Sequence, residues 1–178
     1  MTRISYDPRQ ANKGMDLEAM IERAIEHYNQ NKVALLQKIP TPIRPVKVDY
    51  KKGVIYKAFF EKKSTVDYIG NYKGYMLAFD AKENSIETRF PLSNVEEHQY
   101  SYLRRNKENG GISFLIVSFT TQGEIYYLPF RVLDRYWKGR EKGGRKSIPY
   151  DEFEHEIEPR GLIRVDFIEV VKGVINNA

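Results

Sequence analysis

The chain has 178 residues, of which 41% are hydrophobic and 30% charged, and its formal net charge is +5. This composition is typical of one soluble globular domain with a substantial core, and the absence of cysteine excludes disulfides and thiolate zinc sites. No apolar run approaches the ~20 residues of a membrane span, and residues 1–6 lack the apolar stretch of a secretory signal, so we expect a cytoplasmic protein without membrane contact.

The N-terminal part of the chain predicts a helix and a strand. Apolar residues recur at helical spacing over residues 15–30, with Asn12 or Gly14 near the start of the helix. We expect a strand at residues 33–39. Three prolines follow at positions 40, 42 and 45, and they exclude a helix because proline fixes φ and lacks an N–H donor.

A long β-hairpin is predicted next. Residues 46–50 and 54–60 flank the turn sequence Lys51-Lys52-Gly53. The alternation of these two strands is imperfect and their apolar content is modest. We therefore expect an arm that projects from the core and carries a basic tip.

The rest of the chain predicts alternating strands and helices. We expect a strand at 64–69, a turn at Gly70-Asn71 and a strand at 75–82. A helix capped by Ser93 or Asn94 should run to about Asn109. The apolar run at 112–119 predicts a central strand. Further elements are expected at 124–128 (strand), 131–137 (helix), 150–157 (short helix) and 167–175 (helix). This order indicates one α/β domain over residues 1–178.

Positive charge is concentrated in two segments. Residues 38–63 carry eight basic groups against two acids, and residues 138–146 carry five against one. Such a distribution is typical of proteins that bind polyanions, although a merely solvated surface is the alternative. Aromatic residues within the first segment can stack on exposed bases, which favours nucleic acid. We therefore expect DNA phosphates to contact Lys51, Lys52, Arg145 and Lys146.

A candidate catalytic site follows an apolar strand. Asp80 and Lys82 are two residues apart, so on a strand they share one face, and Asp67 lies on the preceding strand. Two carboxylates can hold Mg²⁺, and a lysine beside them can offset charge that develops on a phosphoryl group. The triplet alone is weak, because two similar acid-x-Lys triplets begin at Asp49 and Glu61 in turn-like or charged contexts. An ion pair at a sheet edge is the alternative.

Ordered blocks of residues resemble the RecU family of Holliday-junction resolvases, within the PD-(D/E)xK nuclease superfamily. The resemblance runs from about residue 12 to the C-terminus. The blocks lie at residues 13–18, 40–42, 64–68, 72–74, 79–83, 90–92, 98–99 and 143–148. Two features depart from the family pattern. Asp80 stands where family members commonly carry Glu, and the basic N-terminal extension that they often carry is short in this chain.

The resemblance implies a restriction-endonuclease-like core, with a central mixed sheet flanked by helices and a protruding hairpin stalk. It implies a homodimer that binds four-way DNA junctions and resolves them by paired symmetric nicks during recombination and repair. The cofactor would be Mg²⁺, with Mn²⁺ as a substitute, and recombinase and branch-migration proteins would be further partners. Residues 38–63 would be the stalk that enters the junction. The metal would be surrounded by Thr65, Asp67, Asp80 and Gln99, and Lys82 would stabilise the transition state.

Two other functions remain compatible with the residues. One is a junction-binding or remodelling protein without catalysis, in which the acids form ion pairs. The other is a different PD-(D/E)xK nuclease that acts on linear or flap DNA. Helix carboxylates approach the metal in some related nucleases, but we expect Glu18 to be an exposed helix acid.

Overall fold

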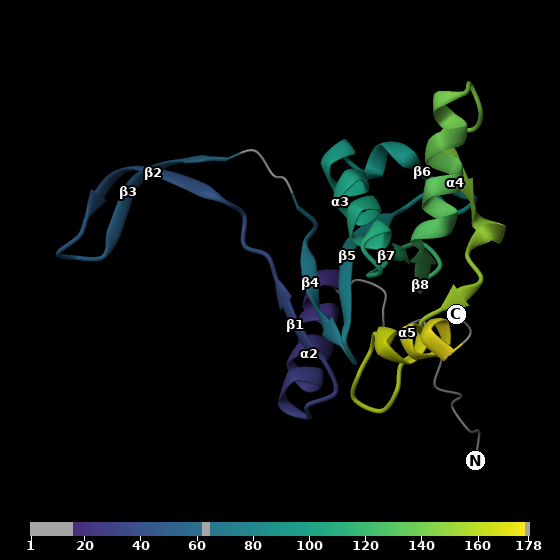
Figure 1. The fold of residues 1–178 in the computed structure, drawn as a ribbon, viewed down its shortest axis with the longest axis horizontal. Helices are drawn as coiled ribbons and strands as arrows, with labels where there is room; N and C mark the ends of the chain where they lie inside the picture. Colours follow the sequence, from purple (N-terminus) through teal and green to yellow (C-terminus); the bar gives the residue numbers. More distant parts are fainter. Residues whose placement is uncertain (1–15, 62–64, 177–178) are drawn as a thin grey trace, which may run out of the picture.

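The structure is a computed structural model that describes residues 16–61 and 65–176 (Figure 1). Its centre is a six-stranded sheet in the order β1-β4-β5-β7-β8-β10. β5 and β7 run parallel, and the other neighbouring pairs are antiparallel. The predicted central mixed sheet is therefore confirmed. Its strands are Leu35–Lys38 (β1), Tyr68–Tyr72 (β4), Tyr75–Asn84 (β5), Ile112–Phe119 (β7), Glu124–Pro129 (β8) and His155–Glu156 (β10).

Helices cover both faces of this sheet and create two cores. The helices α2 (Leu17–Gln30) and α5 (Phe167–Asn176) contribute to one core, and α3 (Glu97–Glu108) and α4 (Phe130–Glu141) to the other. All eight residues of β7 are buried, as predicted for a central strand. Alternation along β7 sends Phe114 and Ile116 into the first core and Leu115 and Val117 into the second.

The N-cap of the first helix lies two to four residues after the expected positions. Asp16 is the N-cap of α2, and its side chain accepts a hydrogen bond from the backbone N–H of Glu18. Asn12 and Gly14 lie outside the described residues. The predicted apolar face of this helix is buried, and it consists of Leu17, Met20, Ile21, Ala24, Ile25 and Tyr28.

The predicted cap of the second helix was wrong. Leu92–Asn94 forms a short 3-10 turn, and α3 starts at Glu97 with Glu96 as its N-cap. Glu96 and Gln99 form a capping box, in which each side chain accepts a hydrogen bond from the backbone N–H of the other. This reciprocal pair satisfies two backbone N–H groups at the start of the helix. A Ser93 or Asn94 side chain acting as a cap would satisfy only one.

The turn between β4 and β5 also differs from its prediction. It lies at Lys73-Gly74, whose φ angles are 50° and 90°, and not at Gly70-Asn71. Asn71 instead accepts a hydrogen bond from the backbone N–H of Gly74 through its side chain. Gly70 lies within β4, where a Cβ atom would come within 2.1 Å of the backbone oxygen of Leu35 on β1. This glycine therefore permits a close strand approach and does not mark a turn.

Short elements complete the body of the protein. β6 (Arg89–Pro91) pairs with β9 (Ser147–Pro149), and both contribute to the core of α3 and α4. The predicted helix at 150–157 was wrong, because a 3-10 turn at Tyr150–Glu152 is followed by the strand β10, which pairs with β8. In the described ranges, no helix is long and apolar enough to cross a membrane.

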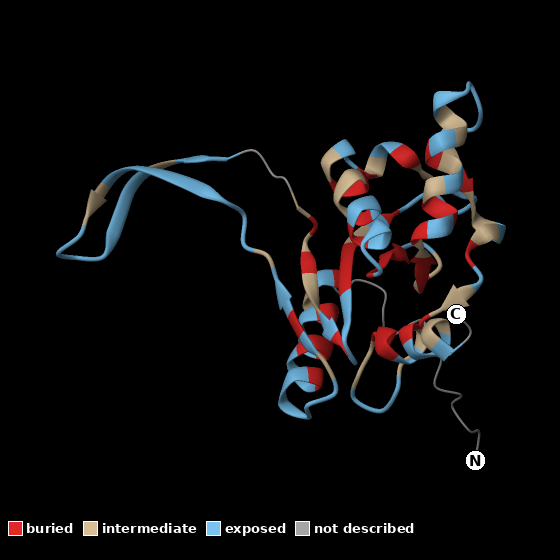
Figure 2. Cartoon of the chain, viewed as in Figure 1, coloured by how far each residue is buried: buried red, intermediate tan, exposed pale blue. Residues whose placement is uncertain are grey.

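The hairpin projects from the body as predicted (Figures 1 and 2). Its strands β2 (Ile43–Asp49) and β3 (Val54–Phe60) form a separate two-stranded sheet with two register irregularities. Most of its residues are exposed and none is buried. The expected arm extends to residue 63, but residues 62–64 lie outside the described residues.

Candidate active site

Asp80, Lys82 and Asp67 meet on one face of the sheet. Asp80 pairs with Leu115 and Lys82 pairs with Val117 across β5 and β7, which places both on the α3 and α4 face. The Nζ atom of Lys82 lies 3.5 Å from Oδ2 of Asp80. The backbone N–H of Asp67 donates to Oδ1 of Asp80 over 2.6 Å. The predicted shared strand face of Asp80 and Lys82 is confirmed.

The carboxylate of Asp80 is fully buried, with 0% of the residue exposed. Burial has the largest effect and raises the pKa of Asp80 to about 7, while the ammonium of Lys82 opposes this rise and the carboxylate of Asp67 adds to it. Only 15% of the Lys82 side chain is exposed, and Asp67 is half-buried, so the cluster reaches the surface through these two residues.

Oδ2 of Asp80 is a buried oxygen without a hydrogen-bond partner. A buried polar atom without a partner is costly unless something else compensates it. A hard divalent cation suits this atom, since Mg²⁺ prefers one or two carboxylates together with waters and substrate phosphates. Within residues 16–61 and 65–176, no cluster of three or more His, Asp or Glu side chains could hold a metal ion. The unpartnered Oδ2 of Asp80 and the nearby carboxylate of Asp67 fit the ligand preference of Mg²⁺.

Gln99 lies against Lys82. Its Oε1 accepts hydrogen bonds from Nζ of Lys82 over 3.0 Å and from the backbone N–H of Glu96 over 2.9 Å. The capping box of α3 thus orients Gln99, and Gln99 orients the ammonium of Lys82. Glu96 was not predicted as a site residue, because the usual capping box begins with Ser or Thr and not with Glu. The predicted metal contact of Gln99 stays a prediction.

Thr65 and Asp67 precede β4 instead of lying within it. The strand predicted at 64–69 was therefore misplaced at its start, because β4 begins only at Tyr68 and Asp67 lies just before it. Thr65 is half-buried, and its metal contact stays a prediction. Glu18 is exposed as expected, and its Oε2 accepts from Nζ of Lys38 over 2.7 Å.

The arm presents both charge and rings to solvent. Tyr50 at the tip is 90% exposed and Phe60 at the base is 83% exposed. Lysine ammonium groups lie over two further rings, with Lys47 5.9 Å from the Tyr56 centroid and Lys57 5.5 Å from that of Phe59. The basic residues Arg44, Lys47, Lys51, Lys52 and Lys57 are all exposed. This surface suits a polyanion with unstacked bases.

A second basic surface lies beside the β6–β9 sheet. Arg145 lines a cavity of about 350 Å³ together with Arg89 and Ser147. The predicted contact residue Lys146 is exposed next to it. Phe90 and Ile148 anchor these strands in the core of α3 and α4, so this surface and the Asp80 cluster belong to the same side of the sheet. Arg89 was not predicted to belong to this surface, because it is far from the basic loop in the sequence.

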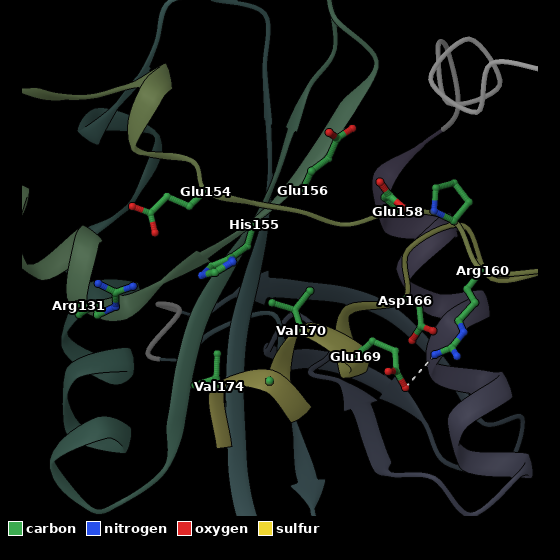
Figure 3. Close-up of a pocket in the computed structure, with 12 residues that line it drawn as sticks. Arg131, Glu154, His155, Glu156, Glu158, Arg160, Asp166, Glu169, Val170 and Val174 are labelled. Carbon is green, nitrogen blue, oxygen red and sulfur yellow. Dashed lines mark ion pairs between the residues drawn. The ribbon is translucent and has the colours of Figure 1, made fainter. Parts of the chain in front are cut away.

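Another cavity lies away from these residues and has the wrong charge for DNA. Figure 3 shows this space of about 1030 Å³ beside α5 and β10, with the ion pair between Arg160 and Glu169. None of the predicted site residues lines it. Its acidic lining residues outnumber the two arginines, and they are Glu154, Glu156, Glu158, Asp166 and Glu169.

The chain is similar in sequence to known proteins. The family profile of RecU, described as Recombination protein U, matches residues 12–173. The chain is 41% identical over 175 residues to the Holliday junction resolvase RecU of Geobacillus sp. (strain WCH70), which covers 95% of this chain and 87% of that protein. It is 39% identical over 171 residues to the protein of the same name from Bacillus subtilis (strain 168). This match covers 93% of this chain and 82% of that protein.

A solved structure of the Holliday junction resolvase Hjc from Archaeoglobus fulgidus is also similar to this chain. The TM-score is 0.42 at 9% identity, and the match covers 76% of this chain and 90% of Hjc. At this TM-score the likeness supports no conclusion about this chain.

Proposed function

The chain belongs to the RecU family of Holliday junction resolvases, and we propose that it is an endonuclease that nicks four-way DNA junctions at the Asp67, Asp80 and Lys82 cluster. One observation carries the assignment of the site. A buried carboxylate oxygen of Asp80 has no hydrogen-bond partner and lies 3.5 Å from the ammonium of Lys82. This arrangement suits a cation and a phosphoryl group better than it suits a structural ion pair.

The carboxylates of Asp67 and Asp80 would hold Mg²⁺ or Mn²⁺, with Thr65 and Gln99 beside it. When bound, the cation would neutralise charge on the scissile phosphate and activate the attacking water. Asp80 is suited to this role because its pKa is raised to about 7, so that ionising it in the buried site is costly until a positive charge compensates it. The chain itself needs no nucleophilic side chain.

Lys82 would stabilise the negative charge that develops on the phosphoryl oxygens. A positioned charge contributes most where water is largely excluded, and only 15% of the Lys82 side chain is exposed. Gln99 holds the ammonium in place through its Oε1, whose hydrogen bond from Glu96 fixes the orientation of the amide. Gln99 and Glu96 therefore act as positioning residues for Lys82.

The arm would enter the opening at the centre of a four-way junction. Its exposed lysines would contact phosphates, and its exposed rings would stack on bases at the branch point. Arg145 and Lys146 would contact a duplex arm, where phosphate contacts position the DNA without reading its sequence. A homodimer with two-fold symmetry would place two such sites on opposed strands. We also propose a cytoplasmic location, with recombinase and branch-migration proteins as partners.

A cleavage assay with point variants tests this assignment. The purified protein is incubated with a four-way junction, a matched linear duplex and a flap substrate, each with Mg²⁺ or with EDTA. We expect paired nicks on the junction only, and only with Mg²⁺. Asp67→Asn and Asp80→Asn should abolish nicking and keep junction binding. Asp151→Asn, at an exposed position outside the site, should keep both.

Each other result identifies an alternative. Retained nicking by Asp67→Asn or Asp80→Asn would remove these residues from the site. Tight junction binding without nicks under any condition would favour a remodelling protein. Cutting of the linear or flap substrate would indicate a different nuclease on the same fold.

A further inference from the structure

The root of the arm is bonded to the candidate catalytic cluster. The backbone N–H of Ile39, the residue after β1, donates to the backbone oxygen of Asp67 over 2.7 Å. The backbone N–H of Asp67 donates in turn to Oδ1 of Asp80 over 2.6 Å. The backbone of Asp67 is thus bonded on both sides. Its C=O group accepts from the root of the arm, and its N–H group donates to the buried carboxylate of Asp80.

The segment between Ile39 and the hairpin is stiff. Pro40 and Pro42 fix their φ angles, and each proline also restricts the residue before it to extended conformations. The backbone oxygen of Pro42 accepts a hydrogen bond from the N–H of Glu61 over 2.9 Å, which joins the two strands at the base of the arm. On the other side, β1 is paired with β4 up to the pair Lys38 and Tyr68. Movement at this root is therefore restricted at both ends.

We propose that Ile39 is a positioning residue that fixes the distance between the arm and the Asp67–Asp80 pair, and thereby selects which phosphodiester is cut relative to the branch point. This inference rests on the proposed function, in which the arm occupies the centre of the junction. If the arm shifts relative to Asp67 while it stays at the branch point, a different phosphodiester lies at the site.

This role differs from a general stabilising contact in what it changes. A hydrogen bond that only stabilises the fold would alter the amount of active protein or the rate of nicking, and leave the position of the nicks unchanged. A positioning contact would alter the distribution of nicks along the strand. The map of nick positions therefore distinguishes the two roles.

The test replaces Ile39 by proline, which removes the N–H donor. Lys38 lies in a β-strand and so already has the extended conformation that a following proline requires. Nicks are mapped at nucleotide resolution on an immobile four-way junction labelled on one strand at a time. Ile39→Pro should bind the junction like the wild type, because every basic residue remains. The ratio of main-position to neighbouring-position nicks should fall about fivefold, which corresponds to the ~1 kcal/mol of one hydrogen bond.

Two further variants keep the test decisive. Ile39→Val retains the N–H and should retain the narrow distribution of nicks. Pro40→Gly combined with Pro42→Gly retains the hydrogen bond from Ile39 and loosens the segment after it, so it should also broaden the distribution. If Ile39→Pro fails to fold, as judged by circular dichroism, this double variant alone decides.

The inference is wrong if folded Ile39→Pro, or the double glycine variant in its place, nicks at the wild-type positions, whether at the normal rate or more slowly. A failure of the proposed function gives a different result, since the wild-type protein would then leave no Mg²⁺-dependent nicks to map.

Discussion

Asp80 should make the protein less stable as the pH rises, provided that no divalent cation is present. Its pKa is about 7 in the folded state, against 3.8 for an ordinary aspartate. Below about pH 3.8 both folded and unfolded chains hold the proton. Between these two values the unfolded chain loses its proton while the folded chain keeps it, so the free energy of unfolding falls by about 1.36 kcal/mol per pH unit. Above pH 7 the loss is complete at about 4 kcal/mol.

The variant Asp80→Asn isolates this effect because it cannot ionise. Its side-chain oxygen can still accept the hydrogen bond from the N–H of Asp67, which is 2.6 Å from Oδ1 in the wild type. Urea unfolding of both proteins in EDTA at pH 4.5, 6 and 8 gives their free energies of unfolding. The difference in favour of Asp80→Asn should grow by about 3 kcal/mol between pH 4.5 and pH 8, and any constant packing difference cancels in this comparison.

Magnesium supplies the second half of the experiment. At a concentration of 100 times Kd, a ligand that binds only the folded state adds about 2.7 kcal/mol to the free energy of unfolding. Mg²⁺ should therefore stabilise the wild type at pH 8 and leave Asp80→Asn nearly unchanged. Parallel pH curves for the two proteins would refute the reasoning, because they would mean that the carboxylate ionises in the folded state as easily as in water.

Three further predictions concern cleavage and DNA binding. Lys82→Ala should lower the single-turnover nicking rate by about 10²- to 10³-fold at saturating protein, as loss of one charge-stabilising group does elsewhere, and an unchanged rate would exclude the proposed role. Arg145→Ala should reduce the slope of log K for junction binding against log salt by about 0.9, whereas Arg23→Ala, an exposed residue on α2 and thus on the opposite face of the sheet, should not change it. Lys51→Ala combined with Lys52→Ala should weaken binding to junctions more than to linear duplex, and gel-shift titrations showing equal losses would contradict the role of the arm.

The sequence predicted those elements whose pattern is governed by local periodicity. The apolar run of β7 and the helical spacing of α2 each require burial on a defined face, and a single chain segment carries that information. The pair Asp80 and Lys82 was predictable for the same reason, since side chains two residues apart on a strand point to the same face. The basic arm was predictable from its prolines, its charge and its modest apolar content.

Features that depend on contacts between distant segments were not predictable in this way. Gly70 resembles a turn residue in the sequence, but the approach of β1 is what requires it. The burial of Asp80 arises from the α3 side of the sheet and not from its own strand. The link from Ile39 to Asp67 joins residues 28 positions apart through the backbone, where side-chain identity gives no signal.

The backbone hydrogen bond between Glu61 and Pro42 forms a narrow neck at the base of the arm, and this neck affects which sequence changes the protein can tolerate. The ribbon beyond it shares no buried residue with the body, so insertions, deletions or charge changes there leave the folding of the body nearly untouched. Evolution, or a protein engineer, can therefore exchange the tip to suit another DNA shape, whereas the few residues below the neck tolerate little change.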